Sequence, residues 1–568
     1  MMLYFVNDSE QHDARLIDLF RNLSDDLTTM MINENFFPLA SELPKSVEIP
    51  KVAGRVLIDG QIITNGFASR VVSSPCTFRS EKDQSLYFPE IGTTPQVTAE
   101  TFMQAVNAAS SAWARGRGEW PSARMEERIS AIAALRDRVL KQREVICRLL
   151  MWEIAKTWTD AQAEFDRTIT YMNDTIEATK QLDRDCSRIQ FVDQIMAQVR
   201  RSPLGVTLCM GPFNYPLNET FTTLIPALIV GNTVIVKLPR FGQLLWDFLL
   251  EPFRDCFPPG VINVVNGTGR EIINPAVRSG KIDVLAFIGS SQVANQIKQS
   301  HPNPHRFRSI LGLDAKNPAI ILPDADLDLT LNECIRGSLS FNGQRCTALK
   351  MIMVHRSVAK TFIEKFSARV DQLNCGLPWD SGVMITPLAD RNKPSHLESY
   401  MKEVLEKGGT LCNPKTGGKT LGSLFFPAVL SGVPLDSRLA QEEQFGPIVP
   451  IMEFDRIEEI EDYVLNSQYG MQASIFGRES KMVGRLVDFL SNQVCRINLN
   501  SQCQRGPDVF PFTGRKNSAE GTLSVTDALR SFSIRSMVAA KQDAIGKEVI
   551  QGVLDGDTSR FLTTNIVL

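Results

Sequence analysis

The segment LGVTLCMGPFNYPLNETFTTLIPALIVGNTVIVK, residues 204–237, decides the fold class. Its first seven residues form a short apolar run that predicts a buried strand, and TVIVK at 233–237 predicts another. Between them lie a turn rich in Gly, Pro and Asn and then a helical stretch that ends at Gly231. A strand, a helix and a second strand in this order form a βαβ unit, whose two strands lie parallel in one sheet.

The same alternation continues along the chain. A helix is expected up to about Phe257, followed by a strand at 261–265, a turn and short helix from Gly267, and a strand at 282–288. This pattern predicts an α/β fold with a mostly parallel sheet. From Ala315 a second α/β region runs to about residue 527.

The flanking regions carry other patterns. Residues 54–63 predict a hairpin that turns at Asp59-Gly60, and the stretch from about 99 to 180 has helical apolar spacing, as at Ile129, Ile132, Leu135 and Val139. Residues 186–203 alternate as a strand pair does, and 529–540 start as a strand. The N-terminal region is otherwise irregular, with a short helix candidate at 11–23 and prolines between 38 and 50.

The composition of the 568-residue chain excludes several classes of protein. The formal net charge is −3, so no basic excess points to nucleic acid, and no apolar run is long enough to cross a bilayer. The N-terminus lacks the basic start of a secretory signal. The 11 cysteines include no C-x-x-C pair, and prolines separate His301 from His305, so we predict a reduced cytoplasmic protein without a metal site.

One cysteine lies in a polar loop. Cys346 belongs to SFNGQRCTA, residues 340–348, in which Gly343 lets the backbone turn. A lone cysteine more often only packs against its neighbours, but a buried structural cysteine is more usual within an apolar run than in such a loop. Cys346 is therefore a candidate nucleophile.

The loop is one of six segments that resemble the motifs of the aldehyde dehydrogenase superfamily, in the order that this superfamily has them. The segments are GPFNYP (211–216), GNTVIVK (231–237), FIGSS (287–291), LSFNGQRC (339–346), EQFGP (443–447) and PFTGRKNS (511–518). The resemblance spans about residues 55–540.

The resemblance implies an aldehyde dehydrogenase-like α/β fold: a Rossmann-type cofactor domain, a catalytic α/β domain and a small β extension used in oligomerisation. The corresponding parts of this chain are 1–54 (N-terminal extension), 55–185 with 204–311 (dinucleotide-binding domain), 312–528 (catalytic domain), 186–203 with 529–540 (oligomerisation strands) and 541–568 (C-terminal tail). A projecting strand pair exposes an edge that a second copy of the chain can cover, so we expect a homodimer or homotetramer.

The chemistry that the resemblance implies is aldehyde oxidation through a thioester. The thiolate of Cys346 attacks the carbonyl carbon, and the side chain of Asn214 with the backbone N–H of Cys346 stabilises the oxyanion. A hydride then leaves for a nicotinamide dinucleotide, and water hydrolyses the thioester.

The cofactor would be held along several of these segments. Lys237 is expected at the adenosine ribose, Glu443 at the nicotinamide ribose and Phe445 beside the nicotinamide, while the amides of Gly289 and Ser290 face a phosphate. The remaining expected cofactor contacts are Pro212, Phe213 and Gly267.

The choice between the two dinucleotides depends on Arg240. NAD-preferring members of the superfamily carry an acid three residues after the lysine that corresponds to Lys237, whereas this chain has Arg240. A cation suits a 2′-phosphate, so we predict NADP over NAD. The alternative is that Arg240 is solvated and uninvolved.

The substrate pocket resembles that of the NADP-dependent, non-phosphorylating glyceraldehyde-3-phosphate dehydrogenases. Arg345 precedes the nucleophile, Arg505 lies in QRGPDVFPF (504–512), Tyr215 follows the oxyanion asparagine and Arg167 lies in an E-x-x-R-T context. Arginine binds phosphate oxygens in a bidentate manner, and cationic neighbours are also expected to lower the pKa of the Cys346 thiol.

The resemblance fails at the general base. Alignment of Lys316 with the E-L-G-G-K motif of the superfamily puts Gly312 where the glutamate belongs. Asp314 is one candidate replacement, Glu442 is another, and transfer of the acyl group to an acceptor such as coenzyme A is a third solution.

The leading prediction is therefore oxidation of glyceraldehyde 3-phosphate to 3-phosphoglycerate with NADP. An aldehyde dehydrogenase for another small or anionic aldehyde, perhaps acyl-transferring, is the alternative within enzymes. The alternative from another class of protein is a dinucleotide-binding scaffold that does not catalyse a reaction. The presence of Cys346 and Asn214 argues against it, because a scaffold has no chemical need for either residue.

Overall fold

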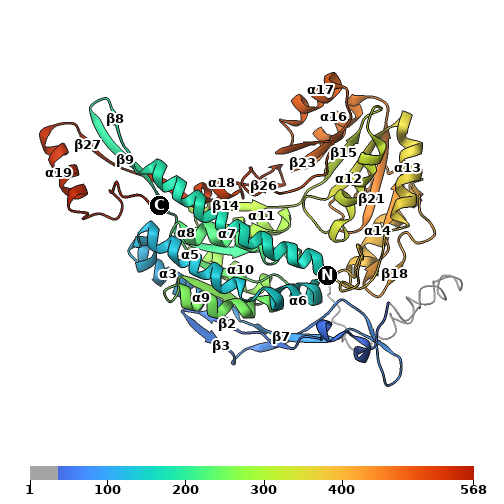
Figure 1. The fold of residues 1–568 in the computed structure, drawn as a ribbon, viewed down its shortest axis with the longest axis horizontal. Helices are drawn as coiled ribbons and strands as arrows, with labels where there is room; N and C mark the ends of the chain where they lie inside the picture. The colour runs from blue at the N-terminus through green and yellow to red at the C-terminus, as the bar shows by residue number, and fades with distance from the viewer. Residues whose placement is uncertain (1–35, 568) are drawn as a thin grey trace.

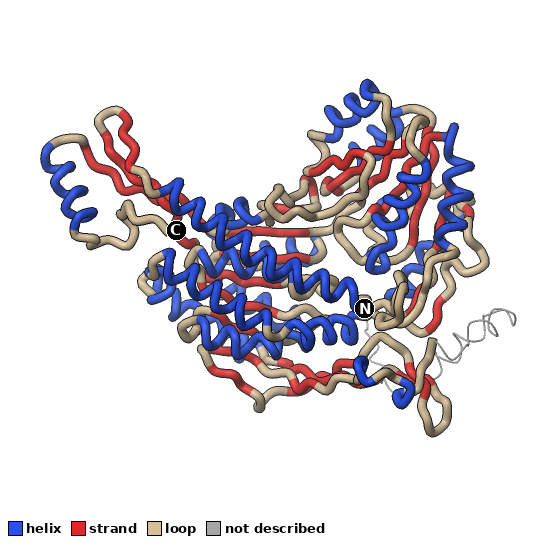
Figure 2. The backbone as a smooth tube through the Cα atoms, in the orientation of Figure 1, coloured by secondary structure: helices blue, strands red, loops and turns tan. Residues whose placement is uncertain are grey.

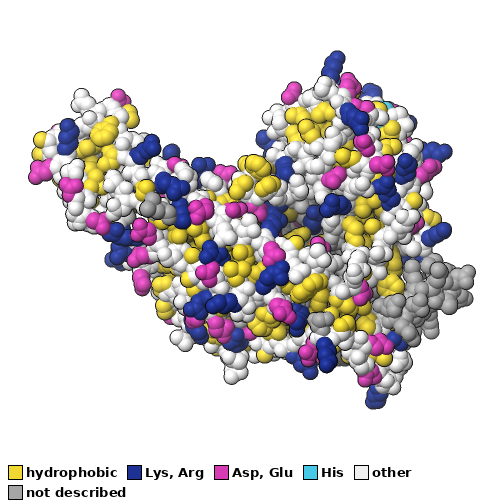
Figure 3. All heavy atoms as spheres, viewed as in Figure 1, with side chains coloured by type: hydrophobic (Ala, Val, Ile, Leu, Met, Phe, Trp, Pro, Cys, Tyr) yellow, Lys and Arg dark blue, Asp and Glu magenta, His cyan; other side chains and the backbone are white. Residues whose placement is uncertain are grey.

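The computed structural model describes residues 36–567, so the helix candidate at 11–23 lies outside the described residues. Two large sheets, each flanked by helices, form the body of the molecule, and a thin three-stranded extension projects from it (Figures 1 and 2). Acidic and basic side chains are interspersed over the face shown in Figure 3. None of the helices within 36–567 is long and apolar enough to cross a membrane.

The first sheet has eight strands in the order β26-β14-β13-β10-β11-β12-β2-β3. The five central strands are parallel, as the βαβ pattern predicts, and the outer ones pair antiparallel. Asp59 and Gly60 both have positive φ in the predicted hairpin. The strands are β2 (Val56–Ile58), β3 (Gln61–Ile63), β10 (Val206–Met210), β11 (Thr233–Lys237), β12 (Ile262–Val265), β13 (Val284–Ile288), β14 (Arg308–Gly312) and β26 (Ala519–Glu520).

Successive residues of the central strands face opposite sides of this sheet and so enter two different cores. Leu208, Ile235 and Leu285 pack with α3 (Ala99–Trp113) and α10 (Gly269–Arg278). Their neighbours Cys209, Val234, Val236, Val284 and Ala286 pack on the other side, with α8 (Asn218–Ile229). The parallel sheet is thus covered on both faces, which explains why its strands are continuous apolar runs.

Further helices extend the layers on both faces of the sheet: α11 (Ser291–Gln299) packs on the side of α3 and α10, and the others pack on the side of α8. Ile129, Ile132, Leu135 and Val139 are all buried on one side of α5, which confirms the helical spacing. The helices are α4 (Glu119–Ser122), α5 (Met125–Leu140), α6 (Arg143–Ile154), α7 (Trp158–Cys186), η4 (Leu244–Leu249), α9 (Leu250–Cys256) and α11 (Ser291–Gln299).

The second large sheet has seven strands in the order β17-β20-β21-β16-β15-β23-β24, and only β17 is antiparallel. Its strands are β15 (Asn317–Ile321), β16 (Leu349–His355), β17 (Thr410–Leu411), β20 (Ala428–Ser431), β21 (Ile448–Phe454), β23 (Gln472–Phe476) and β24 (Arg496–Leu499). Its helices are α12 (Leu327–Leu339), α13 (Arg356–Val370), α14 (Lys393–Glu406), α15 (Arg438–Gln441), α16 (Ile457–Asn466) and α17 (Ser480–Leu490).

The extension is an antiparallel sheet of β8 (Ile189–Val192), β9 (Ile195–Pro203) and β27 (Ser533–Lys541). The prediction of a strand from residue 529 is wrong at its start, because α18 (Val525–Ser531) runs through that position. Val525, Ala528 and Leu529 are buried at helical spacing, and this packing outweighs the β propensity of the segment. The tail forms α19 (Ala544–Asp555), which packs on the extension.

The remaining elements are short. A three-stranded sheet combines β1 (Val52–Ala53), β4 (Ala68–Ser73) and β7 (Glu90–Gln96), and the proline-punctuated stretch contains the 3-10 turns η1 (Ala40–Glu42) and η2 (Lys45–Val47). Three two-stranded pairs complete the strands: β5 (Phe78–Arg79) with β6 (Leu86–Tyr87), β18 (Thr420–Leu421) with β19 (Leu424–Phe425), and β22 (Tyr469–Gly470) with β25 (Arg515–Lys516).

Candidate active site

A cavity of about 770 Å³ lies between the two large sheets. Part of its wall comes from residues that follow the carboxyl ends of β10, β11, β13 and β14, namely 211–215, 239–241, 289–290 and 312–314. The opposite wall comes from loops of the second α/β unit, among them the loop of Cys346. A crevice at the carboxyl ends of parallel strands is where open α/β sheets bind their ligands.

The loop before Cys346 has an unusual backbone. Phe341, Asn342 and Gly343 all have positive φ, a conformation that a bulky residue such as phenylalanine rarely adopts. The side-chain amide of Asn342 bonds both to the carbonyl and to the N–H of Thr386, which holds this turn in place. A Cβ at Gly343 would come within 2.8 Å of the carbonyl oxygens of Ser338 and Gly446, so only glycine fits. Cys346, the candidate nucleophile, thus follows a tightly fixed turn.

Asn214 lies against the same loop. Its Nδ2 donates a 2.7 Å hydrogen bond to the carbonyl oxygen of Gln344, two residues before Cys346. The amide group carries two N–H donors, so a second one is left for an oxyanion at the cysteine.

A wholly buried ion pair fixes the turn that carries Asn214. Lys156 Nζ pairs with Glu164 and donates a 2.8 Å hydrogen bond to the carbonyl oxygen of Asn214. The other oxygen of Glu164 accepts the N–H groups of Leu217 and Asn218, both at 3.1 Å. The sequence analysis did not find this pair, since the two residues lie far from the motif and their types are common on helix surfaces.

The environment of Cys346 does not lower its pKa. Burial raises the pKa of the thiol above its ordinary value and outweighs the opposing effects of Lys350 and Arg345. The cationic neighbours do lower this pKa, as expected, but desolvation of the thiolate is the larger effect, so the net shift is upward.

Glu443 and Phe445 line the cavity on the side of the second sheet. Glu443 pairs with Lys350, a buried residue of β16 that the motif search missed. Burial raises the pKa of Glu443 despite this partner. The Lys350 ammonium also lies 5.0 Å from the centroid of the Phe445 ring, so one lysine orients both residues.

Three cationic residues, Arg70, Lys237 and Arg240, lie near the carboxyl end of β11 in the first sheet. Arg240 lines the cavity, and Arg70 of β4 donates a 2.9 Å hydrogen bond to the carbonyl oxygen of Arg240. Lys237 ends β11, and its Nζ lies 3.9 Å from where a Cβ on Gly269 would be. Burial, followed by the nearby charge of Arg70, lowers the pKa of Lys237 to about 8. Arg70 is a further residue that the sequence motifs did not indicate.

The two candidate bases, Asp314 and Glu442, and the position of the missing glutamate, Gly312, occupy different places. Asp314 lines the cavity, and one carboxylate oxygen accepts a 2.7 Å hydrogen bond from the N–H of Ser291 at the start of α11. Glu442 is exposed and accepts a 2.8 Å hydrogen bond from the hydroxyl of Tyr400, outside the cavity lining. Gly312 lines the cavity, and a Cβ there would meet its nearest neighbour, Leu523 Cδ1, at 3.4 Å. The position therefore has room for a Cβ atom.

The predicted phosphate contacts lie at the other end of the cavity, where Tyr215, Arg167, Arg345 and Arg505 all line it. Arg345 donates to the carbonyl oxygens of Arg336 and Gly337 at 3.1 and 2.8 Å. Burial raises the pKa of Tyr215 to about 12, so its hydroxyl stays protonated at neutral pH and can donate. Burial lowers the pKa of Arg505 to about 10, which leaves its guanidinium charged at neutral pH.

Comparison with known proteins identifies the family to which the chain belongs. The model of the aldehyde dehydrogenase family matches residues 88–538. The chain belongs to the aldehyde dehydrogenase family. The NADP-dependent glyceraldehyde-3-phosphate dehydrogenase of Streptococcus equinus is 33% identical over 471 residues, which are 81% of this chain and 95% of that protein.

Two further proteins share the family likeness. The crystal structure of NADP-dependent glyceraldehyde-3-phosphate dehydrogenase from Bacillus halodurans C-125, complexed with NADP, superposes with a TM-score of 0.77 at 30% identity and covers 86% of this chain and 99% of its own. Malonate-semialdehyde dehydrogenase 1 of Geobacillus kaustophilus is 26% identical over 79% of this chain and 91% of its own length.

In this aldehyde dehydrogenase, fourteen of the sixteen site residues expected from the sequence line the one cavity. The two exceptions, Lys237 and Gly267, do not line it but follow the same sheet edge. The structure adds Lys156, Glu164, Lys350 and Arg70 to the neighbourhood of these residues.

Proposed function

We propose that this aldehyde dehydrogenase oxidises glyceraldehyde 3-phosphate to 3-phosphoglycerate with NADP and without inorganic phosphate. The observation that carries the proposal is that one cavity holds Cys346 and Asn214 together with three arginines, Arg167, Arg345 and Arg505. An apolar aldehyde has no need of three guanidinium groups beside the nucleophile, whereas a phosphate ester does.

The residues divide the work as follows. The Cys346 sulfur, as thiolate, forms a bond to the aldehyde carbon, and the carbonyl electron pair moves to oxygen, where the free N–H of Asn214 stabilises it. NADP, when bound, supplies the acceptor for the hydride that leaves this carbon. The resulting thioester then reacts with water, so that an aldehyde, water and NADP⁺ become a carboxylate, NADPH and two protons.

Asp314 is the proposed general base for that water. Asp314 lines the cavity and lies two residues from Gly312. One of its carboxylate oxygens accepts the hydrogen bond from Ser291, which leaves the other oxygen for the water. Glu442 is disfavoured, because it is exposed and bonded to Tyr400.

The cavity suits the proposed cofactor at several points. Pro212, Phe213, Gly289 and Ser290 line it. The N–H of Gly289, which was expected to face a phosphate, instead donates to the carbonyl oxygen of Gly312, and the N–H of Ser291 at the start of α11 donates to Asp314. Arg240 and Arg70, with Lys237 nearby, supply positive charge for a 2′-phosphate. The likeness to the Bacillus halodurans enzyme, solved with NADP, supports the same choice.

The test is NADPH formation from purified protein and D-glyceraldehyde 3-phosphate, without added phosphate or coenzyme A. Sustained turnover supports hydrolysis. A burst of one NADPH per subunit that resumes only when coenzyme A is added identifies an acyl-transferring enzyme instead, an alternative that Gly312 at the usual glutamate position favours. No NADPH at all excludes this substrate.

We further propose that the extension joins copies of the chain. Phe191 and Val192 on β8 and Ile534 and Met537 on β27 are 47–64% exposed, which is unusual for large apolar side chains. A homodimer or homotetramer that covers them should be visible by light scattering, and Phe191→Asp should dissociate it. A monomeric wild-type protein would contradict this proposal.

A further inference from the structure

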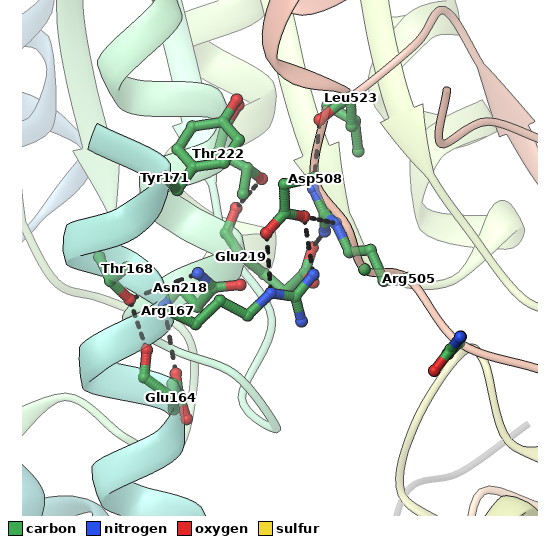
Figure 4. Close-up of polar contacts among 12 residues, drawn as sticks. Glu164, Arg167, Thr168, Tyr171, Asn218, Glu219, Thr222, Arg505, Asp508 and Leu523 are labelled. Atoms are coloured by element: carbon green, nitrogen blue, oxygen red, sulfur yellow. Dashed lines mark hydrogen bonds and ion pairs between the residues drawn. The ribbon is translucent and has the colours of Figure 1, made fainter. Parts of the chain in front are cut away.

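Two carboxylates lie among the arginines that are proposed to bind the substrate phosphate (Figure 4). Arg167 of α7 makes a two-point contact with Asp508, at 2.8 and 2.7 Å. Arg505 lies 3.3 Å from the same Asp508 and also forms an ion pair with Glu219. Arg505 additionally donates a hydrogen bond to the carbonyl oxygen of Leu523.

The charges of this group cancel. Two guanidinium groups face two carboxylates, and Arg167 and Arg505 together hold the pKa of Asp508 below its usual range against the effect of burial. Arg505 is 5% exposed and Glu219 7%. In such a poorly solvated place a charge acts much more strongly on its neighbours than it does at the surface.

Glu219 lies in the first turn of a helix, beside the cavity. Glu219 is the second residue of α8, which begins four residues after Asn214, and it lines the cavity that also holds Cys346. A carboxylate in the first turn of a helix is stabilised by the helix dipole, and Arg505 adds an ion pair. Asp508 has two arginine partners, whereas Arg505 is the only cation with which Glu219 pairs among residues 36–567.

We infer that Glu219 is a specificity-determining residue that competes with the substrate phosphate for Arg505. This inference rests on the proposed function. A phosphate dianion that reaches Arg505 must displace the Glu219 carboxylate or sit beside it, and both weaken binding. An aldehyde without an anionic group does not meet this penalty. Glu219 therefore lowers the affinity for phosphorylated ligands below what Arg167, Arg345 and Arg505 alone would give.

The experiment measures the dissociation constant of glycerol 3-phosphate, an unreactive phosphate ester, by calorimetry on the NADP-bound enzyme. Glu219→Gln keeps the size of the side chain and removes its charge, and binding should tighten about tenfold or more. Glu219→Leu removes the same charge and serves if the glutamine variant does not fold. Glu219→Asp keeps the charge and should stay within about threefold of the wild type.

Asp166→Asn is the matched control. Asp166 lies beside Arg167 on α7, but its carboxylate is exposed and paired with Arg143, outside the cavity lining. The Asp166→Asn substitution changes the net charge of the protein by the same amount as Glu219→Gln. The dissociation constant of this variant for glycerol 3-phosphate should match that of the wild type.

The outcomes separate this inference from the proposed function. Unchanged or weaker binding by folded Glu219→Gln, or equal tightening by Asp166→Asn, overturns the role of Glu219, while NADPH formation from glyceraldehyde 3-phosphate can still support the substrate. Tight binding by Glu219→Gln alone, with no turnover of glyceraldehyde 3-phosphate by the wild type, supports the role of Glu219 and removes the substrate. No binding by any variant overturns both.

Discussion

The carboxylate of Asp314 accepts a 2.7 Å hydrogen bond from the backbone N–H of Ser291, so it caps the first turn of α11 from the end of the neighbouring strand β14. Asp314 thus makes a structural contact through one carboxylate oxygen, and it also lines the cavity that holds Cys346. Whether it also activates water is a kinetic question, and the two roles have different signatures.

Asp314→Asn separates these roles. Loss of a carboxylate at a helix N-terminus costs about 0.3–1 kcal/mol of stability, but loss of a general base slows thioester hydrolysis about 100-fold or more. Stopped-flow measurement should show an intact burst of one NADPH per subunit followed by a much slower steady state. A steady state within about twofold of the wild type would leave Asp314 with only its structural role.

Gly312→Glu tests whether the position that lacks the glutamate can accept one. The nearest atoms to a Cβ there are Leu523 Cδ1 at 3.4 Å and Ile288 Cγ1 at 3.5 Å, which are ordinary contacts. In the Asp314→Asn background, the added carboxylate should raise the steady-state rate about tenfold or more. The matched control is Gly312→Gln, which has the same shape without the charge and should give no such gain.

Arg240→Ala tests the choice of dinucleotide. Removal of a guanidinium from a 2′-phosphate should raise the KM for NADP about tenfold or more and leave the KM for NAD nearly unchanged. Arg70→Ala should act in the same direction, because Arg70 contacts the carbonyl oxygen of Arg240. Equal effects on the two dinucleotides would mean that neither arginine contacts the phosphate that distinguishes them.

The pH dependence of alkylation tests the environment of Cys346. Burial raises the pKa of this thiol above its ordinary value, so below that pKa the reactive thiolate fraction increases about tenfold per pH unit. The rate of iodoacetamide modification of Cys346 in the ligand-free enzyme, followed by mass spectrometry, should still be rising between pH 7.5 and 9. A plateau below pH 8 would show that cationic neighbours dominate after all.

Much of the fold could be predicted because its signals are local. The apolar runs of β10, β11, β12 and β13 alternate with helices, and their burial on both faces makes them continuous. The error near residue 529 arose where Leu529 and its neighbours pack at helical spacing against other elements, which the segment alone does not show.

The residues of the candidate site could likewise be predicted only where their signals are local in the sequence. Cys346 and Asn214 could be found because the motifs around them are short and specific. Lys156, Arg70 and Glu219 could not, because each gains its importance from a partner that is distant along the chain. The direction of the Cys346 pKa likewise depends on how much protein surrounds the thiol, and a sequence does not report that.

The most direct test of the account is NADPH formation from D-glyceraldehyde 3-phosphate by the wild type and by Cys346→Ala, followed beyond one turnover per subunit. Cys503→Ala, which alters a buried cysteine outside the cavity lining, serves as the control. We predict sustained NADPH formation by the wild type and by Cys503→Ala, and none by Cys346→Ala. Equal NADPH formation with and without the Cys346 thiol would contradict the central claim that this cysteine carries the reaction.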